Sequence, residues 1–180
     1  MESLRGHLLI AGPGLVDPNF RRTLVLVGEH NEEGALGVVL NRPAPVTVAE
    51  AIPPLAELVG PADRLFFGGP VRPQAAVVIA DFEDPQRSGL LVMGTIGFLL
   101  GEVDPGSMGG IRRARVFAGY AGWGPGQLES ELGESAWIPE PALPSDVFTE
   151  DPEALWAAVV RRKGGEAALM ATMPFDPSTN

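Results

Sequence analysis

Polar side chains that could bind a ligand lie close to the first β-rich segments of the chain. The candidate ligand-binding set is Asp17, Asn19, Arg21, His30, Asn41 and Arg42. If residues 23–27 pair with residues 35–40, the strand ends come together, and these side chains would form a cluster suited to an anion or a small polar ligand. The structural alternative is that Asp17 and Asn19 form side-chain turns while Arg42 pairs with a carboxylate.

An enzymatic role for this set depends mainly on His30, which could serve as a general base. Its neighbour Glu29 would point to the opposite face of a strand, and a turn position is favoured for His30. Only His7 adds a second imidazole, and cysteine is absent, so we expect no zinc site or other metal site. No nucleophile, base and orienting group are recognisable together, and no catalytic residue is assigned.

A segment rich in glycine and aromatic residues lies between a predicted strand and a predicted helix. Its proposed structural residues are Gly119, Tyr120, Gly122, Trp123, Gly126 and Gln127. Because glycine tolerates positive φ and close approach, we expect a tight turn packed against bulky rings. A phosphate cradle is the alternative, but the spacing matches neither the dinucleotide nor the P-loop pattern.

The acidic charge balance argues against a general nucleic-acid binder. The formal net charge is −10, from 23 acidic and 13 basic residues, whereas binding to a phosphate backbone relies on clustered Lys and Arg. Arg112, Arg113 and Arg115 form the one basic stretch outside a helix end. We interpret them as a solvated strand edge, where charge deters edge pairing. A regulator that contacts DNA through them is the alternative.

Length and hydropathy favour one globular domain in a reducing compartment. A chain of 180 residues can bury a core without metals or disulfides. The absence of cysteine agrees with the cytosol, and no apolar run approaches the roughly 20 residues that span a bilayer. We therefore expect a cytoplasmic protein with no membrane association.

The apolar periodicity and the turn residues predict an α+β fold. Strands are predicted over 7–11, 23–27, 35–40, 64–67, 75–80, 90–93, 115–119 and 136–139. Helices are predicted over 48–59, interrupted at Pro53-Pro54, over 126–134, and from the cap Asp151 to Gly164. A short helical turn is predicted at 98–103. Residues 166–180 are predicted to form a less ordered tail of a single domain, 1–180.

The chain resembles the YqgE/AlgH family of bacterial proteins. The matching segments are Gly6–Ala11, Asp17–Leu26, Glu29-His30, Gly34–Gly37, Leu40–Pro43, Phe67–Val71 with Gly68, Gly69 and Pro70, and Gly119–Leu132 with Trp137. The resemblance implies a compact domain whose mixed, bent β-sheet forms a pseudo-barrel with helices outside it. It implies no cofactor. Some relatives carry the label of transcriptional regulator, which supplies no mechanism.

Three functions are compatible with these observations. The first is a non-enzymatic binding or regulatory protein whose partner is another protein or a small anionic ligand. The second is an enzyme with an unrecognised site at Asp17, Arg21, His30, Asn41 and Arg42. The third is a regulator that contacts DNA. The sequence leaves the oligomeric state undetermined, and we favour the first function because no catalytic set or cofactor motif is visible.

Overall fold

The computed structural model describes residues 2–13, 15, 17–99 and 110–172. Its strands are β1 (His7–Ala11), β2 (Leu24–Asn31), β3 (Gly34–Val39), β4 (Pro43–Thr47), β5 (Arg64–Phe67), β6 (Val71–Phe82), β7 (Leu90–Met93), β8 (Ile96–Leu99), β9 (Ile111–Trp123) and β10 (Trp137–Pro141). Its α-helices are α1 (Val48–Ala51), α2 (Gln127–Gly133), α3 (Pro144–Val147), α4 (Pro152–Lys163) and α5 (Gly165–Ala168). Short 3₁₀ helices are η1 (Pro18–Phe20), η2 (Pro53–Leu58), η3 (Pro85–Arg87) and η5 (Leu169–Thr172).

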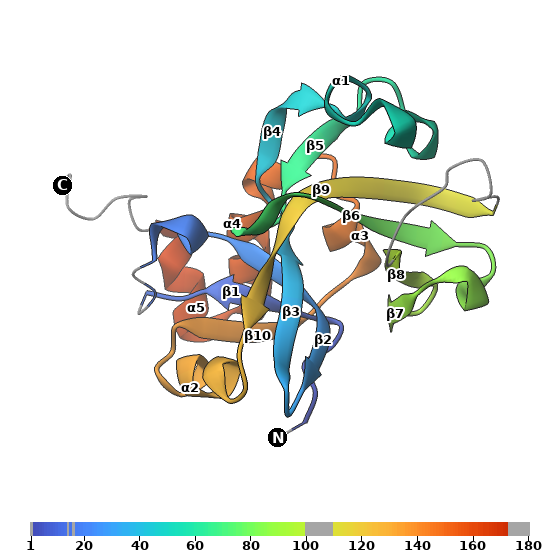
Figure 1. Cartoon of the computed structure of the whole chain (residues 1–180). Coiled ribbons are helices and arrows are strands. Elements are labelled where there is room, and N and C mark those ends of the chain that lie inside the picture. Colours follow the sequence, from blue (N-terminus) through green and yellow to red (C-terminus); the bar gives the residue numbers. More distant parts are fainter. Residues whose placement is uncertain (1, 14, 16, 100–109, 173–180) are drawn as a thin grey trace.

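The strands form one mixed sheet that bends along β9 (Figure 1). The order is β10-β1-β2-β3-β9-β6-β8-β7, with the β4–β5 pair attached to β9. The β5–β9 pairing is parallel and the other pairings are antiparallel. The far end of the sheet also comes back to the start of the chain, because a Cβ on Gly6 would lie 2.9 Å from the Val92 carbonyl oxygen of β7. The α+β class and the bent, mixed sheet are as predicted.

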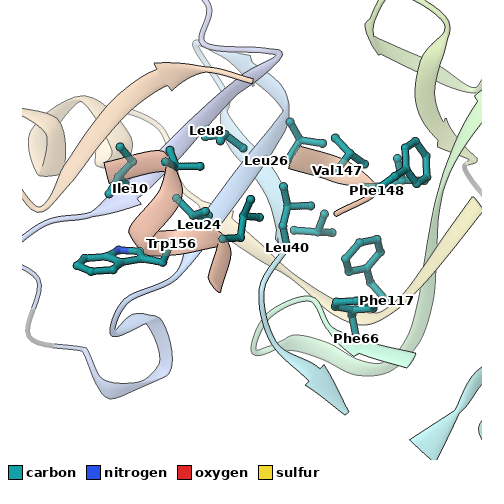
Figure 2. Packing of buried hydrophobic residues seen from close by; sticks show 14 of the residues in the cluster. Leu8, Ile10, Leu24, Leu26, Leu40, Phe66, Phe117, Val147, Phe148 and Trp156 are labelled. Carbon is teal, nitrogen blue, oxygen red and sulfur yellow. The ribbon is translucent and has the colours of Figure 1, made fainter. Parts of the chain in front are cut away.

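The main hydrophobic core lies between the sheet and the C-terminal helices (Figure 2). Leu8, Leu24 and Leu26 of β1 and β2 are fully buried there, together with Val159 of α4. The indole of Trp156 lies at the margin of this cluster in Figure 2. The buried face of α4 consists of Leu155, Trp156, Val159 and Val160, and the predicted cap at Asp151 and stop at Gly164 are confirmed.

A second core packs α2 against the other face of β1, β2 and β3. The rings of Trp123 and Trp137 meet edge to face with centroids 5.8 Å apart. Both indole N–H groups donate to Glu131 Oε1, at 3.2 Å from Trp123 and 2.9 Å from Trp137. The predicted packing role of Trp123 is confirmed, and Glu131 is the acceptor that orders both tryptophans.

The structure corrects the prediction of a tight turn at the glycine-rich segment. Residues 119–123 continue β9 instead, and the chain turns after Trp123. Gly119 has φ +76°, and a Cβ there would lie 2.4 Å from the Gly69 carbonyl oxygen. Glycine is therefore required where β9 passes the segment that follows β5. The rings of Tyr120 and Trp123 are carried by a bent strand.

Two other element predictions differ from the structure. Phe98 and Leu99 belong to β8 and do not begin a helical turn; residues 100–103 lie outside the described residues. Residues 165–172, which include the start of the predicted tail, form α5 and η5, and Met170 is buried. The remainder of that predicted tail, 173–180, also lies outside the described residues. The predicted helix over 48–59 is confirmed as α1 and η2, separated before Pro53.

The C-terminal helices are held together by an ion pair whose carboxylate is buried. Asp146 of α3, 3% exposed, accepts two hydrogen bonds from the guanidinium of Arg162 in α4, at 2.9 Å and 2.8 Å. It also accepts from the Leu143 backbone N–H. A desolvated carboxylate needs such partners. No helix within the described ranges is long and apolar enough to cross a membrane.

Candidate anion-binding site

The β2–β3 hairpin separates the residues that the sequence grouped together. Leu24 begins β2 beside Leu40 and Asn41, whereas His30 lies near the hairpin turn at the other end. His30 lies six positions along the strand from Leu24, or about 20 Å at 3.3 Å per residue. The structure therefore brings together Arg21, Asn41 and Arg42, and it places His30 elsewhere. The backbone of Asn19 lies in η1, and its side chain is outside the description.

The grouped residues line a surface hollow of about 330 Å³. We call it the arginine hollow, and its lining residues are Arg21, Arg22, Asn41, Arg42, Glu153, Trp156 and Ala157. Three arginines face one glutamate, in a protein whose overall charge is strongly negative. The loop before β2, the segment after β3 and the first turns of α4 each contribute part of the wall.

Asn41 fixes the backbone at the floor of the arginine hollow. Its Oδ1 accepts from the Leu24 N–H at 3.0 Å, and its Nδ2 donates to the Arg22 carbonyl at 2.9 Å. Arg22 has φ +52°, in the left-handed region that is unfavourable for a side-chain-bearing residue. Backbone strain of this kind persists only where surrounding contacts hold it. The two bonds made by Asn41 are contacts of that kind.

Arg42 is half-buried and contacts the loop that precedes β2. Its Nη2 donates to the Arg21 carbonyl at 3.2 Å and to the Pro18 carbonyl at 3.5 Å. Burial lowers the pKa of Arg42, and the negative charge of Asp17 acts in the opposite direction. A bound anion would favour the charged guanidinium in the same way as Asp17 does.

The Trp156 ring and the Arg22 guanidinium that stacks on it form one side of the arginine hollow. The Arg22 guanidinium lies over the Trp156 ring, 4.7 Å from its centroid. The indole is 6% exposed and is held by the main core. This stacking orients a cation at the hollow and covers an aromatic face. Sequence reasoning missed Trp156 and Glu153, because α4 follows β2 by more than a hundred residues.

A second hollow of about 190 Å³ adjoins the first through a shared residue. We call it the phenylalanine hollow, and its lining residues are Val39, Arg42, Phe67, Gly69 and Pro70. Two backbone bonds join its walls: the Phe67 N–H donates to the Arg42 carbonyl at 2.8 Å, and the Val39 N–H donates to the Gly68 carbonyl at 2.9 Å. A Cβ on Gly69 would lie 2.2 Å from the Tyr120 carbonyl, so this segment is tightly fixed against β9.

His30 occupies a strand position and not the turn predicted for it. It is buried, its Nδ1 accepts from the Leu4 N–H at 3.0 Å, and its Nε2 contacts the Glu129 carboxylate. The acceptor role of Nδ1 places the ring proton on Nε2, which donates to Glu129. Both ring nitrogens are therefore occupied, and this arrangement fixes α2 and the N-terminal segment to β2.

A larger hollow, about 850 Å³, lies at this end of the hairpin and is wide open. It is lined by Glu32, Glu33 and Glu129 as well as by His30. Its negative charge disfavours an anion, and the described residues contain no group of three acidic or histidine side chains that could hold a metal. We therefore assign the candidate site to the arginine hollow, which is smaller and carries positive charge.

The three arginines lie on a part of β9 that pairs with β6 alone, so the predicted strand edge is confirmed, because β3 and β5 pair only with later residues of β9. The edge is not simply solvated, since the arginines contact neighbouring segments. Arg115 donates to the Val147 carbonyl at 3.0 Å and lies 5.0 Å from the centroid of the Phe66 ring. Arg113 donates to the Phe148 carbonyl, and Arg112 forms an ion pair with Asp81. These contacts attach the segment after α3 to the sheet, which is a structural role for the basic stretch.

Comparison with known proteins identifies close relatives over the whole chain. The model of the family described as AlgH-like matches residues 8–168. A UPF0301 protein of Streptomyces coelicolor is 46% identical over 187 residues, covering 100% of this chain and 97% of that protein. A UPF0301 protein of Thermobifida fusca is 41% identical over 192 residues, covering 99% of this chain and 96% of that protein.

Two solved structures share the fold. The crystal structure of a Corynebacterium diphtheriae protein has a TM-score of 0.84 at 30% identity, covering 96% of this chain and 94% of that one. The solution structure of the AlgH protein from Pseudomonas aeruginosa has a TM-score of 0.69 at 32% identity, covering 97% of this chain and 98% of that one.

Proposed function

The chain belongs to the YqgE/AlgH family, described as AlgH-like. From that premise we propose that it is a non-enzymatic binding protein, which holds a small anionic ligand in the arginine hollow. The observation that carries the proposal is the convergence of Arg21, Arg22 and Arg42 on one hollow. In this acidic protein such a concentration of positive charge would attract a phosphate or carboxylate group. Guanidinium groups suit these anions because their planar forks match two oxygens at once.

The construction of the hollow supports the proposal. Asn41 fixes the strained backbone of Arg22, and the Trp156 ring orients the guanidinium of the same residue. A site whose donors are already positioned loses less conformational entropy when a ligand binds. The half-buried environment of Arg42 strengthens its attraction for an anion relative to a fully solvated arginine.

The absence of a recognisable reactive group around this hollow favours binding over catalysis. Its described lining contains no histidine, serine, threonine, tyrosine or lysine. Glu153 is the one carboxylate among those lining residues, and it is exposed at the start of α4. His30, the base considered from the sequence, lies at the other end of β2 with both ring nitrogens occupied.

The proposal is tested by calorimetry and thermal unfolding with inorganic phosphate, pyrophosphate and di- and tricarboxylic acids at low salt. At a concentration 100 times its dissociation constant, a ligand that binds only the native state stabilises it by about 2.7 kcal/mol. We expect Arg42→Ala to weaken binding at least tenfold, since a charge-assisted bond contributes about 1.5–3 kcal/mol. We expect Glu153→Gln to strengthen binding, because it removes the negative charge of the lining.

Arg161→Ala is the matched control, because Arg161 is exposed on α4 and does not line the hollow. It removes the same charge, so equal weakening by Arg161→Ala and Arg42→Ala would indicate nonspecific attraction. Arg21→Ala provides a second test, because Arg21 is exposed and its loss should disturb the fold less than that of Arg42. If none of these anions binds the wild-type protein at low salt, the proposal is wrong.

A further inference from the structure

We propose that the anion is the phosphate group of a nucleoside phosphate, whose base stacks on Phe67 in the phenylalanine hollow. This inference rests on the proposed function, because the arginine hollow would hold the phosphates. What it adds is a second point of recognition and a chemical class for the whole ligand. The observation behind it is that one residue, Arg42, lines both hollows.

The shared arginine sets the distance between the two recognition points. An arginine side chain is shorter than a nucleotide, and Arg42 contributes to the wall of each hollow. A ligand that fills both must therefore be compact, with its anionic end and its apolar end on either side of Arg42. Nucleoside phosphates have this layout, with a charged group at one end and a flat ring at the other.

Phe67 provides the surface for the flat ring. Its exposure is 51%, whereas Phe66 and Phe117 beside it are buried, as are Phe82 of β6, Phe98 of β8 and Phe148 just after α3. A base can stack on an exposed aromatic face whatever its pattern of hydrogen-bonding groups. Pro70 and Val39 extend the apolar surface around that ring.

The position of Phe67 relative to Arg42 is fixed by the backbone. The Phe67 N–H donates to the Arg42 carbonyl at 2.8 Å. Parallel pairing places Phe67 beside Ala118 in β9, and Gly68 follows at a point where a Cβ would lie 2.3 Å from the Gly119 carbonyl. The aromatic ring and the cation are therefore carried by neighbouring backbone segments that cannot separate without breaking the sheet.

The charge and the size of the two hollows also favour this ligand over a long peptide. The volumes are about 330 Å³ and about 190 Å³, which together lie within the range of small-ligand pockets. Three arginines face Glu153, and the charge of Asp17 also acts on Arg42, so the arginine hollow keeps a positive balance that suits an anionic group, whereas the phenylalanine hollow has no acidic lining residue.

The test compares ADP, AMP, pyrophosphate and adenosine by isothermal titration calorimetry on the full chain at low salt. We expect ADP to bind at least tenfold more tightly than pyrophosphate. Phe67→Ala should remove this advantage and leave pyrophosphate binding unchanged, because stacking on an aromatic side chain accounts for about tenfold or more in affinity. Phe67→Trp should preserve ADP binding, and Arg42→Ala should weaken both ligands.

Leu91→Ala is the matched control, since Leu91 is another exposed hydrophobic residue, 37% exposed, on the distant strand β7. ADP binding no tighter than that of pyrophosphate would overturn this inference and leave the anion site intact. ADP binding that Phe67→Ala does not change would overturn it as well. If neither ADP nor pyrophosphate binds, the anion-binding proposal fails together with it.

Discussion

At the scale of single residues, two carboxylates of α2 have roles that are invisible in the sequence. Glu131 accepts from two indoles, and Glu129 accepts from His30. The sequence places both on a surface helix next to Gln127, where a glutamate is normally solvated. Their partners lie in β2, β9 and β10, and only the folded sheet brings these strands under α2. The packing of the tryptophans was predictable from residue type, whereas the role of Glu131 as the acceptor of their N–H groups was not.

We predict that Glu131→Ala will destabilise the protein by roughly 2 kcal/mol or more, because it leaves two partly buried indole N–H groups without their charged acceptor. Urea unfolding followed by tryptophan fluorescence measures the change. Glu134→Ala is the control, since Glu134 is exposed just beyond the same helix. Equal effects of the two substitutions would show that the indole bonds add nothing to stability.

The contact between His30 and Glu129 predicts a pH dependence. The hydrogen bond from His30 lowers the pKa of Glu129 below its ordinary value of 4.5. A carboxylate whose pKa is lower in the folded state stabilises the fold above its unfolded pKa, and this contribution is lost as the pH falls through the folded pKa. Glu129→Gln should therefore reduce the free energy of unfolding near neutral pH and have a smaller effect at about pH 3.

Denaturant titrations of wild type and Glu129→Gln at several pH values measure this difference. A comparison with Glu134→Gln corrects for the general effect of acid on the protein. The prediction is wrong if the difference between wild type and Glu129→Gln stays constant, or grows, as the solution is acidified.

At the scale of elements, periodicity predicted most strands and helices, and it failed where tertiary contacts decide the conformation. Glycine-rich residues 119–123 read as a turn, because nothing local shows that β3 and β6 pair with them. The β2–β3 hairpin was predicted correctly, yet the candidate site was only partly right. His30 lies near the turn of the hairpin, whereas Asn41 and Arg42 follow the open end, so the structure places His30 far from them.

The bend of β9 predicts opposite effects for two glycine substitutions. Gly119→Ala should destabilise by about 2 kcal/mol or more, because its φ is +76° and a Cβ would lie 2.4 Å from the Gly69 carbonyl oxygen. Gly133→Ala, in α2, has nothing within 4 Å of its added Cβ and should be neutral or stabilising by up to about 1 kcal/mol. Thermal unfolding of both variants decides the matter; similar losses of stability would contradict the account of the bend.

At the scale of the whole molecule, β9 is shared by both parts of the sheet. Its last residues pair with β3, and its first residues pair with β6. Because neither part has a complete set of backbone partners without this strand, we expect a single cooperative unfolding transition. Trp123, Trp137 and Trp156 all lie away from β6, β7 and β8 in sequence. The unfolding midpoint from the fluorescence of these tryptophans should nonetheless equal the midpoint from far-ultraviolet circular dichroism. Two separated midpoints would contradict this expectation.

The pairing of the first strand with the last has a consequence for synthesis on the ribosome. β1 forms bonds with β10, which ends at Pro141, so an emerging chain presents the β1–β2–β3 meander about a hundred residues before that neighbour exists. At about 5–20 residues per second, the wait is roughly 5 to 20 seconds. Leu8, Leu9, Val25 and Leu26, which supply both faces of that meander, are fully buried in the finished protein. Until β10 is made these side chains form an exposed apolar surface, and we expect the nascent chain to be prone to aggregation over that interval.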